Sequence, residues 1–143
     1  MAVVVKGLTV YSCTNISTLN RLAVKQKKSI RVINNAKYRE HTGPLFKELR
    51  ILPLTKMIEL AKLKFMHKYV QDKLPLSFAE TWVTNRQRNV QTNLRNADAF
   101  FIPPHQRDNF KRFPLYTFPT AWNNADENKY NPNLYTFLRS QKL

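Results

Sequence analysis

Two stretches of the chain place apolar residues at the spacing of an α-helix, and they constrain the fold more than any other feature. Over residues 16–35 the apolar side chains fall on one side of a helix, and Gln26 is the one polar residue on that side. Residues 54–73 carry a broader apolar stripe. We expect the two helices to pack their apolar sides together. The apolar residues of the first helix are Ile16, Leu19, Leu22, Ala23, Ile30 and Ile33.

Polar and proline residues predict the helix ends. Asn34 and Asn35 can end the first helix, because Asn tolerates the left-handed backbone found just past helix ends. The pattern of residues 42–53 predicts a shorter helix that ends at Pro53. The helix predicted over residues 54–73 ends at Leu74-Pro75. Three polar residues can cap the start of the first helix: Thr14, Asn15 and Ser17.

Outside these helices the pattern is weaker. Residues 2–12 are rich in Val, Thr and Tyr, which favours a short strand or an extended arm. Residues 77–82 predict one further turn of helix, residues 100–118 short strands or extended aromatic segments, and residues 132–141 a short terminal helix.

The fold prediction follows from these elements. We predict a mainly α fold, a small helical bundle with a short β or irregular, aromatic-rich C-terminal cap. Residues 1–83 form its helical part and residues 84–143 a basic, aromatic-rich, irregular part, and we expect the two to fold as one unit.

Scarce residue types exclude several classes of protein. Among 143 residues the only glycines are Gly7 and Gly43, so the chain cannot contain the glycine-rich phosphate loops of dinucleotide and P-loop enzymes. A lone Cys13 excludes a disulfide framework and favours an intracellular setting, nuclear or cytoplasmic. The apolar run at the N-terminus is too short for a secretory signal, and no stretch approaches the roughly 20 apolar residues that a membrane span needs.

The acidic residues are too few and too scattered for catalysis by paired carboxylates. Of nine, only Asp126 and Glu127 are adjacent, and adjacent side chains point in different directions. A two-metal nuclease or polymerase site needs converging carboxylates. The three histidines are far apart and favour structural or surface roles. We therefore expect no catalytic residues, no metal site and no cofactor.

The charge is strongly one-sided and points to an anionic partner. The chain carries a net charge of +15, and residues 1–39 hold eight basic residues and no acid. Four of these, Arg21, Lys25, Lys28 and Arg31, lie opposite the apolar side of the first helix, with Lys27 at the margin. An ordinary solvated face is the simplest alternative, but such faces mix both signs, whereas a face of one sign attracts phosphates.

Several segments together resemble non-LTR retrotransposon reverse transcriptases of the jockey-like class. The resemblance covers roughly residues 8–141 and rests on the order and spacing of its motifs, each of which is weak alone. The matching segments are QKKSIRVI at 26–33, YREHTGPLF at 38–46, LRILPL at 49–54, FMHKY at 65–69, LPLSF at 74–78, NLRNA at 93–97 and PTAWN at 119–123.

The resemblance implies the thumb and C-terminal region of the enzyme, downstream of its catalytic aspartates. The first helix would then lie along the backbone of the template and primer. The expected partner is RNA or an RNA/DNA hybrid, bound without catalysis, and a protein partner also stays open. The candidate nucleic-acid contacts are Arg21, Lys25, Lys27, Lys28, Arg31, Lys37, Arg39 and Arg95.

Three other interpretations remain open from the sequence. The chain could be a structural or assembly subunit of a larger ribonucleoprotein or protein complex that docks through its basic face. It could be an enzyme, against the carboxylate argument. It could also be a truncated element product that folds poorly, for which a non-cooperative melt would be the sign.

Overall fold

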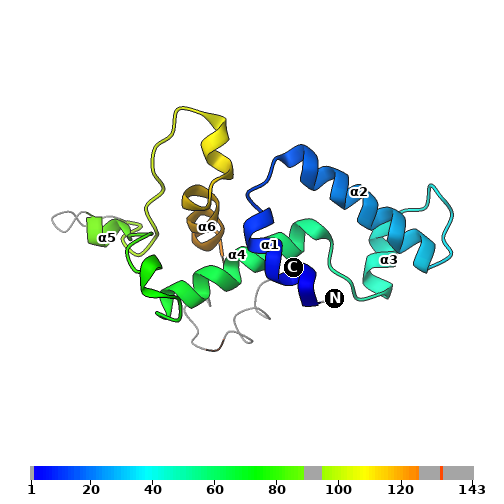
Figure 1. The fold of residues 1–143 in the computed structure, drawn as a ribbon, viewed down its shortest axis with the longest axis horizontal. Helices are drawn as coiled ribbons and strands as arrows, with labels where there is room; N and C mark the ends of the chain where they lie inside the picture. The colour runs from blue at the N-terminus through cyan, green and yellow to red at the C-terminus, as the bar shows by residue number, and fades with distance from the viewer. Residues whose placement is uncertain (1, 89–94, 126–132, 134–143) are drawn as a thin grey trace. The chain divides into compact units, whose positions relative to one another are not determined.

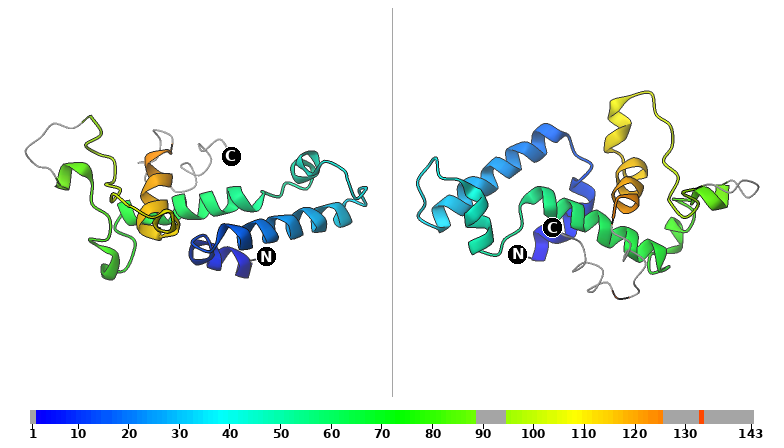
Figure 2. Two further views of the ribbon diagram at one scale, coloured as in Figure 1. Left: turned by 90° about the horizontal axis from the view of Figure 1, so that it is seen from above. Right: turned by 180° about the vertical axis from the view of Figure 1, so that it is seen from behind.

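The computed structural model describes residues 2–88, 95–125 and 133, and the chain divides into two compact units, residues 1–59 and 60–143. Helices dominate both units (Figures 1 and 2), which confirms the mainly α prediction. None of the described helices has the length and hydropathy needed to cross a membrane. The division expected at residue 84 rests on composition and stays a prediction.

The first unit contains three helices and the start of a fourth. These are α1 (Ala2–Tyr11), α2 (Ile16–Ile33), α3 (Thr42–Glu48) and α4 (Leu54–Val70), the last of which continues into the second unit. Helices α2 and α3 lie side by side (Figure 1). Both predicted long helices are therefore present, and they end two and three residues before the predicted positions.

A small core joins α2 to α3. Ile30 of α2 packs with Leu45 and Phe46 of α3, and all three are buried. Only Ile30 of the apolar side of α2 is fully buried, and it packs on α3. The short α3 reaches Ile30 because the chain turns back on α2 directly after Asn35. The packing expected between α2 and the helix of residues 54–73 stays a prediction.

Gln26, the polar exception on the apolar side of α2, has a structural role. Its side-chain nitrogen donates to the carbonyl of Leu52 at 3.0 Å, and its side-chain oxygen accepts from the backbone N–H of Leu54 at 2.8 Å. That N–H belongs to the first residue of α4, where the helix itself offers no acceptor. Gln26 therefore fixes the start of α4 against the middle of α2.

The caps of α2 form as the sequence predicts. The Asn15 side chain accepts a hydrogen bond from the N–H of Ser17. At the other end Asn35 is left-handed, with φ 50°, and the N–H of Ala36 reaches back to the carbonyl of Arg31 at 2.9 Å. This is a Schellman end, in which the residues past the helix satisfy its last carbonyls.

The N-terminal segment is helical, so the prediction of a strand or extended arm over residues 2–12 was wrong. Helix α1 ends with the N–H of Ser12 bonded to the carbonyl of Leu8 at 2.8 Å, while the Ser12 hydroxyl donates to the carbonyl of Thr9. The β-propensity of valine reflects packing on a pleated sheet. The described residues contain no sheet to receive it, so local helical bonds satisfy the backbone.

The second unit is built from one long and several short helices. Besides the rest of α4 it contains η1 (Leu76–Phe78), α5 (Asn85–Arg88), η2 (Asp108–Arg112) and α6 (Pro114–Asn123). Helix α6 lies beside α4 (Figure 2), where the rings of Phe65 and Phe118 are 5.2 Å apart. The turn predicted over residues 77–82 corresponds to η1, shifted toward the N-terminus.

Aromatic side chains form the core of this unit. The ring of Trp82 stacks on Phe118 and meets Phe65 and Tyr69 edge-on, and Trp82, Phe118 and Trp122 are buried. The Tyr69 hydroxyl donates to the carbonyl of Trp82 at 2.7 Å. Aromatic residues of α4 and of the C-terminal half therefore build this core together, while Phe113 stays exposed.

Helical structure replaces the strands expected between residues 110 and 118. These residues belong to η2 and α6, with Pro114 at the start of α6. Pairing of the β type is limited, among the described residues, to one bridge between Thr84 and Phe100. Aromatic residues two or three apart suited a strand as well as one face of a helix. The terminal helix predicted over 132–141 falls outside the described residues.

Candidate nucleic-acid interface

Helix α2 presents the predicted basic residues on one exposed side. Each residue advances about 100° around a helix, so Arg21, Lys25 and Lys28 lie within about 60° of one another. All three are exposed. Arg31 lies about 80° from Arg21, and Lys27 about 120° from it, away from the centre of this face. We call Arg21, Lys25, Lys28 and Arg31 the basic face.

The described residues place no carboxylate in an ion pair with the cations of the basic face. Within the described parts of the chain, ion pairs join Lys56 to Glu59, Arg86 to Asp98 and Lys111 to Asp108, and no residue of the basic face takes part in one. Helix α2 itself contains no acidic residue. Its positive field therefore extends into solvent.

Arg31 is held at the C-terminal end of this face. Its Nε donates to the backbone carbonyl of Glu40 at 2.9 Å, and the side chain is only partly exposed. The bond uses one of five guanidinium N–H donors, so the others can still bind an anion. Arg31 is thus a preoriented cation, whereas the lysines are mobile ones.

The predicted contacts Lys37 and Arg39 lie in the turn after α2, in a mixed electrostatic setting. Both side chains are exposed. The carboxylate of Glu40 accepts from the backbone N–H of Lys37 at 3.0 Å, which places a negative charge beside them. A phosphate would be attracted less strongly here than at the middle of α2.

A groove opens between the end of α2 and this turn. Its volume is about 510 Å³. The side chains of Val32 and Tyr38 are 76% and 78% exposed along it. The groove is lined by Lys28, Arg31, Val32, Asn35, Ala36 and Tyr38. It therefore combines two cations with an exposed aromatic ring, which sequence reasoning did not single out.

The last predicted contact, Arg95, belongs to the second unit, where it is exposed in a turn. Several other cations of this unit are engaged locally. Arg86 pairs with Asp98 at 3.1 Å, and the guanidinium of Arg88 lies 3.8 Å from the centre of the Phe101 ring. The Lys111 ammonium hydrogen-bonds to Asp108 at 2.8 Å, which lowers the pKa of Asp108 and raises that of Lys111. Local partners therefore engage Arg86, Arg88 and Lys111 of this unit.

Two of the three histidines pack against neighbouring side chains. His67 is buried beside Gln71, and His105 stacks on Phe110. Where the structure describes the chain, no three His, Cys, Asp or Glu side chains come close enough to hold a metal ion.

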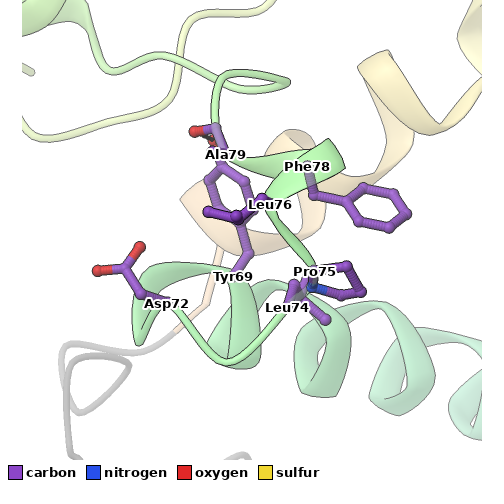
Figure 3. Close-up of a pocket in the computed structure, with 7 residues that line it drawn as sticks. All are labelled: Tyr69, Asp72, Leu74, Pro75, Leu76, Phe78 and Ala79. Carbon is purple, nitrogen blue, oxygen red and sulfur yellow. Dashed lines mark hydrogen bonds between the residues drawn. The ribbon is translucent and has the colours of Figure 1, made fainter.

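A second hollow lies in the other unit, at the end of α4. It measures about 70 Å³, and the ring of Tyr69 extends through it toward Ala79, whose carbonyl accepts from the tyrosine hydroxyl at 3.1 Å (Figure 3). Asp72 points away from the ring. A space of this size holds a few water molecules and excludes a nucleotide. The groove beside α2 is thus the better candidate for a ligand.

Comparison of the chain with protein-family models, with curated proteins and with solved structures found no match.

Proposed function

We propose that this protein binds a nucleic-acid backbone, RNA or an RNA/DNA hybrid, along the basic face of α2 without catalysing a reaction on it. The observation that carries the proposal is the face itself, with Arg21, Lys25 and Lys28 exposed and unneutralised on one side of a regular helix. From Arg21 to Arg31 the helix rises about 15 Å, the length of about four phosphates of one strand.

The resemblance to retrotransposon reverse transcriptases agrees with this proposal. In that family the matching helix belongs to the thumb and tracks the template and primer, and the catalytic aspartates lie upstream of the matching part. We accordingly propose that the chain corresponds to a thumb and C-terminal region. A polymerase assay on the purified chain should give no product above background, and primer extension would overturn this part of the proposal.

A salt titration tests the binding. Each phosphate neutralised on duplex DNA contributes a slope of about −0.9 to log K against log salt, and each on a single strand about −0.7. Four contacts predict slopes of about −3.6 and −2.8. Fluorescence anisotropy should be measured with a single strand, a DNA duplex and an RNA/DNA hybrid. Binding that is flat in salt, or no binding to any probe, would refute the proposal.

One observation favours a second function, that of an assembly subunit. Ile16, Leu22 and Ile33, on the apolar side of α2, are all exposed. Exposed apolar groups beside a charged face are typical of surfaces that dock on another protein. Retention of a fixed protein partner after nuclease treatment, with no oligonucleotide binding by the purified chain, would favour this function over the first.

A further inference from the structure

The turn after α2 is fixed, so the groove beside it is a formed surface. The left-handed Asn35 reverses the chain, and Ala36 packs on the core of Ile30, Leu45 and Phe46. The bond from Arg31 to the carbonyl of Glu40 fastens the far side of the turn to the helix. Tyr38 lies between these attachments, so its position follows from the fold.

Tyr38 has an aromatic ring without an aromatic neighbour. Within the described residues it forms no ring–ring contact, whereas Trp82, Phe118 and Tyr69 all pack against other rings. Leaving such a ring 78% exposed gives up the free energy of its burial. An exposed ring beside cations is the arrangement on which single-stranded nucleic acids stack their bases.

The cations beside the ring suit a phosphate. Lys28 and Arg31 both line the groove. The helix C-terminus alone would repel an anion. Its last carbonyls, however, are bonded to the N–H groups of residues 34–36, and two full positive charges outweigh the partial negative charge of the helix end. The volume of about 510 Å³ is in the range of small-ligand sites.

We propose that this groove takes one unstacked nucleotide of a single strand, with its base on the ring of Tyr38 and its phosphate between Lys28 and Arg31. The proposal rests on the proposed function and deepens it. A base inside a duplex has both faces covered by its neighbours and cannot use the ring. The groove therefore gives the protein a preference for single strands, or for duplexes that carry a single-stranded end, over blunt duplexes.

The test compares Tyr38→Ala and Tyr38→Phe with the parent chain on two probes, a single strand carrying 2-aminopurine and a blunt duplex of equal length. Stacking on an aromatic residue contributes about 1–3 kcal/mol per base, so Tyr38→Ala should weaken single-strand binding about tenfold. The phosphates still bind, so the salt slope should stay the same. Tyr38→Phe should bind as the parent does, and 2-aminopurine fluorescence should be quenched only where a ring is present.

The matched control is Tyr11→Ala, which removes an exposed tyrosine that does not line the groove. It should leave both affinities within twofold. Circular dichroism should be unchanged in each variant, because both rings lie largely in solvent.

Several results would overturn the inference. Equal weakening of single strand and duplex by Tyr38→Ala, loss of binding in Tyr38→Phe, or tight Tyr38-dependent binding of an acidic peptide would each do so. If the parent chain binds with the expected salt slope but Tyr38→Ala changes nothing, the inference fails and the proposed function stands. If the parent chain binds neither probe, both fail.

Discussion

Among the described residues, three with left-handed backbone end helices, and none of them is glycine. Asn35, Arg50 and Asp72 have φ of 50°, 52° and 53° after α2, α3 and α4. In each case the next residue donates its N–H back to the helix, as Ile51 does to the carbonyl of Phe46 at 3.0 Å. Helices α3 and α4 therefore stop before the prolines that the sequence suggested as their ends.

The strain at these positions leads to a prediction for Arg50. A left-handed conformation costs a residue with a side chain about 1–2 kcal/mol, whereas glycine adopts it freely but loses more entropy on folding. Arg50→Gly should raise the free energy of unfolding by about 0.5–1 kcal/mol. Urea denaturation measures the change. Arg50→Ala is the control, since it removes the same charge but keeps the penalty. Equal stability of the two variants would contradict this explanation.

At the residue scale, the sequence predicted helix caps but not the surroundings of single side chains. Asn15 was one of three caps that the sequence offered, and Asn35 one of two residues expected to end the helix, because capping depends on the residue and its immediate neighbours. The sequence did not single out Tyr38, because only the folded turn shows that its ring is exposed beside Lys28 and Arg31. Local chemistry can be deduced from the sequence, whereas the surroundings of a side chain require the fold.

At the scale of elements, side-chain amides hold helices to neighbouring segments. Gln26 bonds to both Leu52 and Leu54 at the start of α4. In the second unit the Asn123 side chain pairs with both backbone groups of Phe100, accepting from its N–H at 3.0 Å and donating to its carbonyl at 2.9 Å. Each amide supplies one donor and one acceptor, as the edge of a strand would.

Gln26 allows a test that separates two explanations of α2. If only the apolar stripe mattered, Gln26→Leu would stabilise the protein. Because the amide forms two hydrogen bonds at the start of α4, to Leu52 and Leu54, we expect a loss of about 1–2 kcal/mol instead. Gln26→Glu keeps an acceptor for the N–H of Leu54 but turns a second oxygen toward the carbonyl of Leu52, so it should also lose stability. Thermal melts of the parent chain, Gln26→Leu and Gln26→Glu distinguish the two explanations. A higher melting temperature of Gln26→Leu than of the parent chain would refute the bridging role of Gln26.

Asn123 gives the corresponding test in the second unit. Asn123→Asp keeps the acceptor but turns a second oxygen toward the carbonyl of Phe100, so the free energy of unfolding should fall by about 1–3 kcal/mol. Asn124→Asp is the matched control. It adds the same charge one residue further along, at the exposed cap of α6, and so carries a similar helix-dipole penalty. If chemical denaturation shows the same loss of unfolding free energy in both variants, the Asn123 amide does not stabilise the protein through Phe100.

The elements that the sequence predicted well are those whose order is local. Helices α2 and α4 have long stripes of helical period, and both begin where predicted. The N-terminal segment and residues 110–118 were assigned wrongly because valine and closely spaced aromatics fit a strand as well as a helix. The packing of α2 on α3 depends on the turn between them, which periodicity does not encode.

At the scale of the whole molecule, some of the basic side chains have local partners and others are left exposed to solvent. The net charge of +15 attracts any polyanion at long range. The second unit uses Arg86 and Lys111 in ion pairs and Arg88 against an aromatic ring, while the basic face of α2 has no such partners among the described residues. Composition alone predicted an anionic partner. The cations of the basic face, unpaired among the described residues, favour α2 as the place where this partner binds.

We propose above all that the nucleic-acid backbone binds along α2. Removing the same number of charges from α2 and from another helix tests this most directly. Lys25→Gln with Lys28→Gln removes two charges from α2, and Lys64→Gln with Lys68→Gln removes two exposed lysines from α4. Salt-titrated binding of a single strand should show the slope of the α2 variant fall by about 1.4, two contacts at about 0.7 each, and that of the α4 variant stay as in the parent chain. Equal changes in the two variants would mean that net charge, and not the basic face, binds the nucleic acid.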